Sequence, residues 1–208
     1  MRTIIALVCL GLLACIMPVG AQGAPKEYSL TVSVHESLHP RLTAPEVTRL
    51  LKGTSDLLNK CNVRFTLKGS VKTFSSAPAI IRDGSASDRD AVYAVDADVK
   101  VVHEINFCHP GLPKPFNGCS FPFEMGRNSM IVTHIRAGSD ELRSILWAHE
   151  FGHRTGLQHR PQPEAIMSGC GLEGFQDDVT DDECRCYFSG PGTCPPAHVI
   201  NHPVCSNQ

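Results

Sequence analysis

The chain is 208 residues long, has a formal net charge of −2 at pH 7 and contains 42% hydrophobic residues. A chain of this length can bury the core of one domain. The near-neutral charge and the 6% aromatic content argue against binding to nucleic acid or to an anionic membrane surface. No segment after residue 21 has the roughly 20 apolar residues of a membrane-spanning helix. We therefore expect a single monomeric domain over residues 22–208.

The first 21 residues predict a secretory signal peptide. Arg2 precedes an apolar run at residues 4–17, and small residues before Ala21 suit cleavage after that position. An alternative is a lipoprotein signal, because residues 12–15 resemble the motif in which a cysteine, here Cys15, is acylated and anchors the chain. The apolar run continues past this cysteine, which argues against the alternative. We expect a secreted, extracellular protein.

Removal of the signal peptide would leave eight of the ten cysteines. An even number in an exported chain predicts up to four disulfide bonds, whose pairing the sequence leaves open. Cys184 and Cys186 are spaced closely enough to bind a structural zinc ion instead. Five of the eight follow Met167, so we expect cross-links more than core to hold the C-terminal residues. The disulfide candidates are Cys61, Cys108, Cys119, Cys170, Cys184, Cys186, Cys194 and Cys205.

The next elements predict a strand, a helix and further strands. Apolar and polar residues alternate over residues 28–34, as in a half-buried strand. Thr43 and Glu46 form a capping box at the start of a helix with an apolar face. Strands are predicted at residues 63–67 and 99–107. This order predicts a crossover connection and a mostly parallel sheet.

Residues 83–90 contain three aspartates and predict an exposed, flexible loop. Calcium is a weaker alternative there, since it prefers carboxylate oxygens. The aspartate spacing departs from that of an EF-hand loop, and no glutamate follows at the position of the bidentate ligand. We therefore favour a solvated loop.

A Pro/Gly-rich loop follows, which Cys108 and Cys119 could close with a disulfide bond. Residues 129–135 then predict a short buried strand. Later in the chain, Thr180 and Glu183 form another capping box. We therefore expect a short helix near the C-terminus.

Residues 149–159 carry the most informative motif, on a helix that we expect to begin after the N-cap Ser139. His149 and His153 are four residues apart and so lie one turn apart on one face, where both can bind the same metal ion. Glu150 points to another side of the helix. From there it can act as general base on a metal-bound water molecule.

The third histidine, His159, requires this helix to end. On a continuous helix it would lie about 15 Å along the axis from His149, too far to share an ion. Gly156 can adopt the left-handed conformation that ends helices, which lets the chain fold back. Single buried histidines usually belong to the core, but three in this spacing with Glu150 favour one catalytic zinc ion with an open position.

This stretch matches the pattern H-E-x-x-H-x-x-G-x-x-H, and the chain therefore resembles the metzincin family of zinc metallopeptidases. The resemblance implies a methionine turn under the metal, with Met167 as a hydrophobic base that has no chemical role. Met167 follows His159 by eight residues, which is similar to the matrixin branch. Arg160 after the third histidine, and the lack of a tyrosine two residues after Met167, differ from the better-known branches.

The resemblance also implies an α+β fold. A mostly parallel, twisted sheet with an edge strand would carry a backing helix and the active-site helix over residues 22–159, followed by a small disulfide-rich subdomain over residues 160–208. The edge strand, expected at residues 118–123 or in the strand after it, would pair with extended polypeptide substrates. A disulfide bond at Cys170 would fix the wall of the specificity pocket.

Together these features predict a zinc metalloendopeptidase that is most active near neutral to mildly alkaline pH, because the histidine ligands must be deprotonated. No prodomain with a zinc-blocking residue is recognised, so the enzyme is either secreted active or restrained by a separate protein inhibitor. Two alternatives use the same site. One is a secreted zinc-containing binding or toxin-like module without turnover, which would not need Glu150. The other is a hydrolase of non-peptide amides.

Overall fold

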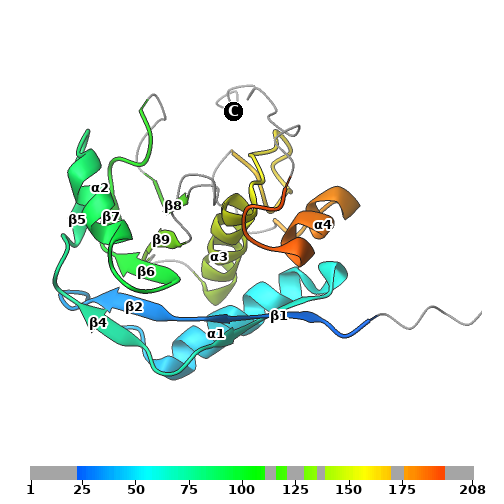
Figure 1. Ribbon diagram of the computed structural model, residues 1–208, viewed down its shortest axis with the longest axis horizontal. Helices are drawn as coiled ribbons and strands as arrows, with labels where there is room; N and C mark the ends of the chain where they lie inside the picture. Colours follow the sequence, from blue (N-terminus) through cyan, green and yellow to red (C-terminus); the bar gives the residue numbers. More distant parts are fainter. Residues whose placement is uncertain (1–22, 111–115, 121–128, 135–138, 170–175, 195–208) are drawn as a thin grey trace, which may run out of the picture.

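Residues 23–110, 116–120, 129–134, 139–169 and 176–194 are described by the computed structural model (Figure 1). The helices there are α1 (Ala44–Leu57), α2 (Ala86–Tyr93), α3 (Asp140–Thr155) and α4 (Asp181–Ser189), with a 3₁₀ turn at Asn59–Cys61. The strands are β1 (Lys26–Leu30), β2 (Val32–His35), β3 (Val63–Leu67), β4 (Lys72–Phe74), β5 (Ile80–Ile81), β6 (Val99–Val102), β7 (Glu104–Ile105), β8 (Gly118–Ser120) and β9 (Met130–Thr133). Across these ranges no helix combines the length and apolar character that crossing a membrane requires.

The largest sheet has the strand order β4-β2-β6-β9-β8. Strands β4, β2, β6 and β9 are parallel, whereas β8 runs antiparallel to β9 at the edge. Two further parallel pairs, β1 with β3 and β5 with β7, are hydrogen-bonded separately. The predicted mostly parallel sheet with an edge strand is therefore confirmed, although the strands divide into three sheets rather than one.

The single strand predicted at residues 28–34 is wrong, because the chain breaks at Thr31 into β1 and β2, which belong to different sheets. The backbone N–H and the hydroxyl of Thr31 both donate to Asp98 Oδ2, at 2.8 and 2.7 Å. The Asp98 carboxylate thus accepts from the backbone N–H of Thr31, which is then not available to continue the ladder between strands. The strand predicted at residues 99–107 is likewise divided at His103, whose N–H donates to Ala79 O at 2.8 Å.

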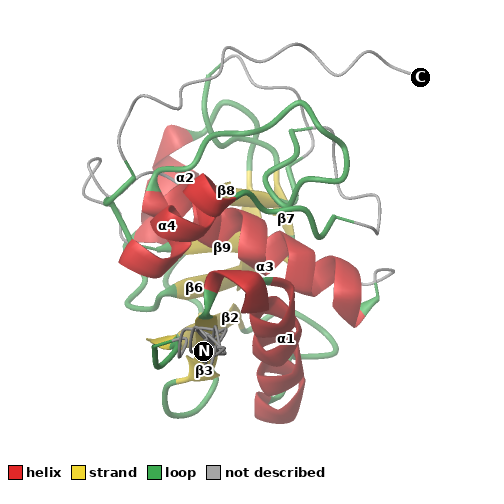
Figure 2. Ribbon diagram, turned by 90° about the vertical axis from the view of Figure 1, so that its right-hand side faces the viewer, coloured by secondary structure: helices red, strands yellow, loops and turns green. Residues whose placement is uncertain are grey.

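Helix α1 begins with the predicted capping box, in which the Thr43 N–H donates to Glu46 Oε2 at 2.7 Å. The helix connects β2 to β3 and packs beside α3, as Figure 2 shows. The main core lies between these two helices and one face of the large sheet. A second core on the other face includes Val92 of α2 and the Cys108–Cys119 bond. The sheet therefore supports α3 from one side only.

The flexible loop predicted at residues 83–90 is wrong, because α2 begins at Ala86. Ser85 caps this helix by accepting a hydrogen bond from Asp88 N at 3.2 Å. The Arg82 guanidinium donates to both carboxylate oxygens of Asp88, at 2.6 and 2.8 Å, and holds the pKa of Asp88 well below its usual range. Arg89 pairs with Asp90. Two of the three aspartates, Asp88 and Asp90, thus pair with arginines.

Three disulfide bonds join Cys61 to Cys184, Cys108 to Cys119 and Cys186 to Cys194. The predicted closure of the Pro/Gly-rich loop is confirmed. The alternative structural zinc site at Cys184 and Cys186 is wrong, since each sulfur is bonded to a different cysteine. Cys170, Cys205 and the N-terminal segment with Cys15 lie outside the described residues.

The Cys61–Cys184 bond is expected to contribute more to stability than the Cys108–Cys119 bond. They join residues 123 and 11 positions apart, and a longer closed loop removes more entropy from the unfolded chain, about 5 against about 3 kcal/mol. We expect the Cys61→Ala/Cys184→Ala variant to lose about 2 kcal/mol more free energy of unfolding than Cys108→Ala/Cys119→Ala. Guanidinium unfolding under non-reducing conditions measures both. Equal losses, or the reverse order, would contradict this.

Candidate metal centre and active site

Helix α3 begins and ends as the sequence predicts. Ser139 is the N-cap, and its hydroxyl accepts a hydrogen bond from Leu142 N at 3.2 Å. Gly156 ends the helix with φ of 106°, a left-handed conformation that costs little only for glycine. The Leu157 N–H then donates to Gly152 O at 3.1 Å, which turns the chain back. This reversal brings His159 beside the helix.

The three motif histidines converge through their Nε2 atoms. His149 and His153 are 3.1 Å apart at these atoms, His153 and His159 are 3.0 Å apart, and His159 and His149 are 3.1 Å apart. Nitrogens bound to one zinc ion at about 2.0–2.1 Å in tetrahedral geometry lie about 3.3 Å apart. The observed triangle is close to that size, so these residues fit one metal ion.

The other ring nitrogens show how the protons are arranged. His149 Nδ1 lies 2.8 Å from Ile166 O, and His153 Nδ1 lies 2.8 Å from Leu157 O. Because a carbonyl oxygen only accepts, both Nδ1 atoms are the donors, and the Nε2 atoms of neutral rings then carry lone pairs. Burial, and next the charge of His159, lower the pKa of His149 to about 3, which favours the neutral ring. Converging lone pairs repel one another unless a cation lies between them.

Glu150 lies on α3 next to the first histidine and is only 4% exposed. Its Oε2 has no partner within hydrogen-bonding distance among the described residues. Burial raises the pKa of the Glu150 carboxyl to about 8, and the nearby Ser120 hydroxyl opposes this only in part. A buried carboxyl oxygen without a partner is costly in a folded protein, which marks Glu150 as a functional candidate.

The Glu150 side chain packs directly on Gly118 of the edge strand β8. A Cβ atom built on Gly118 would lie 2.1 Å from Glu150 Oε1 and 2.5 Å from its Cγ, so only glycine leaves room for the carboxylate. The edge strand was predicted at residues 118–123 or in the strand after it, and this contact was not predicted. The Cys119 disulfide bond and the Tyr93 hydroxyl, which donates to Cys119 O at 2.7 Å, hold β8 in place.

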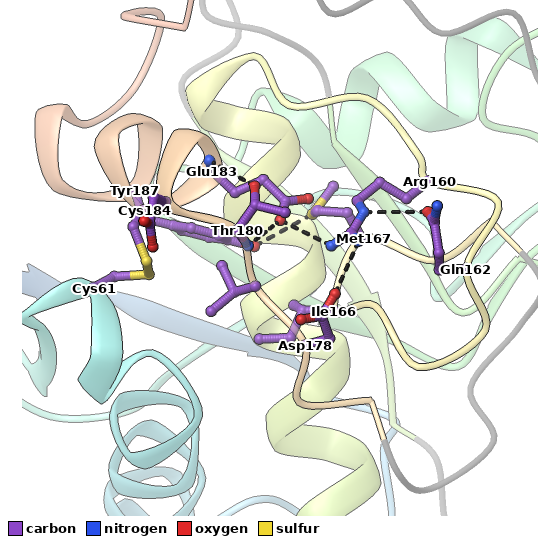
Figure 3. Close-up of polar contacts among 12 residues, drawn as sticks. Cys61, Arg160, Gln162, Ile166, Met167, Asp178, Thr180, Glu183, Cys184 and Tyr187 are labelled. Atoms are coloured by element: carbon purple, nitrogen blue, oxygen red, sulfur yellow. Dashed lines mark hydrogen bonds and ion pairs between the residues drawn. A yellow bond between two sulfur atoms is a disulfide. The ribbon is translucent and has the colours of Figure 1, made fainter.

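Met167 lies against α3 at Gly152. A Cβ atom on Gly152 would lie 2.3 Å from Met167 Sδ and 2.6 Å from the Tyr187 hydroxyl oxygen. Tyr187 is fully buried, and its hydroxyl lies 3.3 Å from Met167 Sδ and 3.2 Å from Ala148 O (Figure 3). Gly152, which stands at an unspecified position of the motif, therefore lets the methionine and α4 approach the helix that carries the histidines.

The residue that anchors α3 to the strands, Arg154, was not among those predicted from the sequence. Arg154 is buried, and its Nη2 lies 3.5 Å from Asp98 Oδ1. Asp98 also accepts the two hydrogen bonds from Thr31 at the strand break. The helical spacing of the sequence could have indicated that Arg154 is buried. Trp147, Phe151 and Arg154 follow one another at intervals of four and three residues and form a buried stripe on α3.

Among the described residues, one trio of potential metal ligands has its ligand atoms within 4.8 Å of one another: His149, His153 and His159. Other histidines there make local contacts instead. His35 Nε2 lies 3.0 Å from Ala77 O, and His103 Nε2 lies 3.1 Å from Ser37 O. The described part of the chain thus brings the three predicted ligands together and gathers no second such group.

No protein-family profile matches the sequence, and no curated protein matches it. The structure is similar to the crystal structure of Archaemetzincin from Methanopyrus kandleri, with a TM-score of 0.52 and 16% sequence identity over 81% of this chain and 97% of that chain. A zinc-dependent peptidase from Methanocorpusculum labreanum matches with a TM-score of 0.48 and 14% identity, over 76% of this chain and 99% of that chain.

At 16% identity, the likeness to the Archaemetzincin structure concerns the fold. It agrees with the resemblance inferred from the histidine motif, while the matrixin-like branch remains a prediction. The histidine trio independently provides three nitrogen ligands suited to one zinc ion. The chain therefore has the fold of the Archaemetzincin structure, with a group of residues in it that can bind one zinc ion.

Proposed function

We propose that the protein is a secreted zinc-dependent endopeptidase of the metzincin type, which hydrolyses internal peptide bonds. The observation that carries the proposal is the convergence of His149, His153 and His159 at 3.0–3.1 Å, with the buried Glu150 on the same helix. A purely structural histidine cluster would not explain a buried carboxyl whose Oε2 atom has no hydrogen-bond partner among the described residues. The likeness to the Archaemetzincin structure, with a TM-score of 0.52, supports the fold that this function needs.

The histidines are held for metal binding by the chain around them. Ile166 O orients His149 and Leu157 O orients His153, each through Nδ1, so that Nε2 remains available to a ligand. Zinc, when bound, supplies a Lewis acid that polarises a carbonyl group and lowers the pKa of a water molecule. Met167 packs under the ligands as an apolar support and takes no part in proton transfer.

Glu150 is the general base in this proposal. Its carboxylate removes a proton from the attacking water and then passes that proton to the departing amine. Gly118 and the buried surroundings set the position of the carboxylate. A cation in the histidine trio would favour the ionised form and so oppose the effect of burial on the pKa.

The edge strand β8 is the proposed binding site for substrate. Thr133 N donates to Asn117 O at 2.8 Å, so Asn117 and Cys119 direct their backbone groups toward β9. Gly118 and Ser120 alternate with them and direct their N–H and C=O groups away from β9, toward the edge. An extended polypeptide can add to such an edge through backbone hydrogen bonds, with little dependence on its side chains.

Secretion is part of the proposal. The three disulfide bonds suit an oxidising compartment, and residues 1–21 have the composition of a signal peptide. Residues 22–208 form the catalytic domain, with the third ligand, His159, at the boundary between its two subdomains. We propose that it acts as a monomer, which is either secreted active or restrained by a separate protein inhibitor.

Digestion of casein by the purified mature protein tests this function. We expect cleavage at internal bonds, one zinc ion per chain, loss of activity with 1,10-phenanthroline, and recovery when zinc is returned after the chelator is removed. Full zinc occupancy without cleavage of casein or of small amides would favour the binding or toxin-like module. Hydrolysis of small non-peptide amides alone would favour an amide hydrolase. Activity that persists in metal-free protein would contradict zinc catalysis.

A further inference from the structure

Arg160 directly follows the third histidine and connects its loop to the turn that contains Met167. The Arg160 N–H donates to Met167 O at 2.7 Å, and the Gly169 N–H donates to Arg160 O at 3.1 Å. The backbone on the C-terminal side of His159 is thus paired with the residues around Met167. Any movement of Arg160 would therefore be transmitted to the imidazole of His159.

The Arg160 side chain extends this connection to the C-terminal helix (Figure 3). Its Nη2 lies 2.8 Å from Asp178 Oδ2, its Nη1 lies 3.0 Å from Glu183 Oε2, and its Nε lies 3.3 Å from Gln162 Oε1. The Arg160 side chain is only 15% exposed and that of Glu183 is 9% exposed. An arginine fork can satisfy several acceptors in a fixed geometry, and limited solvent access strengthens such pairs.

Glu183 is itself held in place. Glu183 Oε2, which accepts from Arg160 Nη1, also accepts a hydrogen bond from Thr180 N at 2.7 Å in the capping box of α4. The Cys61–Cys184 bond ties the same helix to the end of the α1 segment, and the Tyr187 hydroxyl contacts Met167 Sδ. Helix α4 therefore provides a rigid support for the Arg160 guanidinium.

We propose that Arg160 is a positioning residue for the metal ligand His159. The inference rests on the metal site of the proposed function. His149 and His153 are ordered by α3 itself, whereas His159 follows the end of that helix. The Arg160–Glu183 pair fixes this loop on α4, so that the third nitrogen is in place before metal binds. Without the pair, two ordered ligands remain and metal affinity falls.

The zinc dissociation constant tests this, measured by competition with a chromophoric chelator at fixed pH. We expect Arg160→Met, which keeps the apolar stem, to raise the dissociation constant about 10- to 100-fold, as loss of a contact that orients a ligand typically does. Glu183→Gln should raise it less, because an amide oxygen still accepts from Thr180 N. Arg160→Lys should restore part of the affinity, since lysine keeps the charge without the fork.

Arg185→Met is the matched control. Arg185 lies on α4, the helix that also carries Glu183. Its side chain pairs with Asp182 and is 73% exposed, so its loss should leave zinc affinity within about twofold of the wild type. Urea unfolding of the metal-free proteins separates ligand positioning from folding. If metal-free Arg160→Met is unfolded, the zinc affinity of Glu183→Gln is compared with that of Arg185→Met instead.

Two results would overturn this inference and leave the proposed function unaffected. One is wild-type zinc binding with folded Arg160→Met and Glu183→Gln variants that bind as tightly as Arg185→Met. The other is loss of affinity only in variants whose metal-free form has unfolded, which would assign Arg160 a structural role. If the wild type itself binds no zinc, the proposed function fails and the inference fails with it.

Discussion

Replacing Glu150 with glutamine is expected to lower kcat for casein or a peptide substrate by about 10²- to 10⁴-fold, the usual contribution of a general base. Glutamine has nearly the same shape, so the packing on Gly118 should be kept. The residue is separate from the histidine trio, and zinc content should therefore remain one ion per chain. Because burial raises the pKa of Glu150, the neutral amide should leave the metal-free protein at least as stable as the wild type at neutral pH.

Glu141→Gln provides the matched control for this variant. Glu141 is an exposed glutamate in the first turn of the same helix. Its substitution removes the same charge without touching the site, so kcat should change by less than about twofold. If Glu150→Gln kept most of its activity with zinc bound, the general base would have to be another residue. If it lost zinc, Glu150 would have to support the metal.

Replacing Gly118 with alanine is expected to lower kcat by about 10²-fold, the effect that misplacing a catalytic group by about 1 Å can have. The added Cβ atom would lie 2.1–2.5 Å from three atoms of Glu150, so the side chain as a whole must move. The backbone of Gly118 does not have positive φ, and alanine can therefore keep its conformation. Steady-state kinetics with zinc content measured on the same sample test this prediction.

Gly23→Ala is a suitable control, because no atom lies within 4 Å of the added Cβ position. It should leave both kcat and the unfolding midpoint near those of the wild type. The Gly118→Ala variant should keep its zinc and its Cys108–Cys119 bond. A normal kcat would show that Glu150 can adopt another position without loss, and it would count against the contact with β8 as a determinant of catalysis.

The site is assembled from segments that are distant in the sequence. Helix α3 supplies His149, His153 and Glu150, the chain beyond Gly156 supplies His159, and Ile166 orients the first ligand. Strand β8 sets the position of the carboxylate from the opposite side. Helix α4, tied by disulfide bonds to Cys61 and Cys194, supports both Met167 and Arg160. Stability of the C-terminal segment and geometry of the metal site are therefore linked.

Local features could be predicted from the sequence because their physical causes are local. Ser139 and Thr43 begin helices through bonds to residues three positions away, and Gly156 ends one through its own backbone conformation. The spacing of His149 and His153 follows from the helical repeat alone. The order of strand, helix and strand also sufficed to predict parallel pairing, since a crossover connection leaves few other arrangements.

Contacts between distant residues were decided only by the tertiary structure. The break at Thr31 depends on Asp98, and the room for Glu150 depends on Gly118, neither of which leaves a pattern near the affected residue. The pairing of Cys61 with Cys184 is one of many that eight cysteines allow. The sequence by itself thus determined which residues can bind a metal ion. The packing of β8 and α4 around them decided where those residues lie, because such packing depends on the whole core.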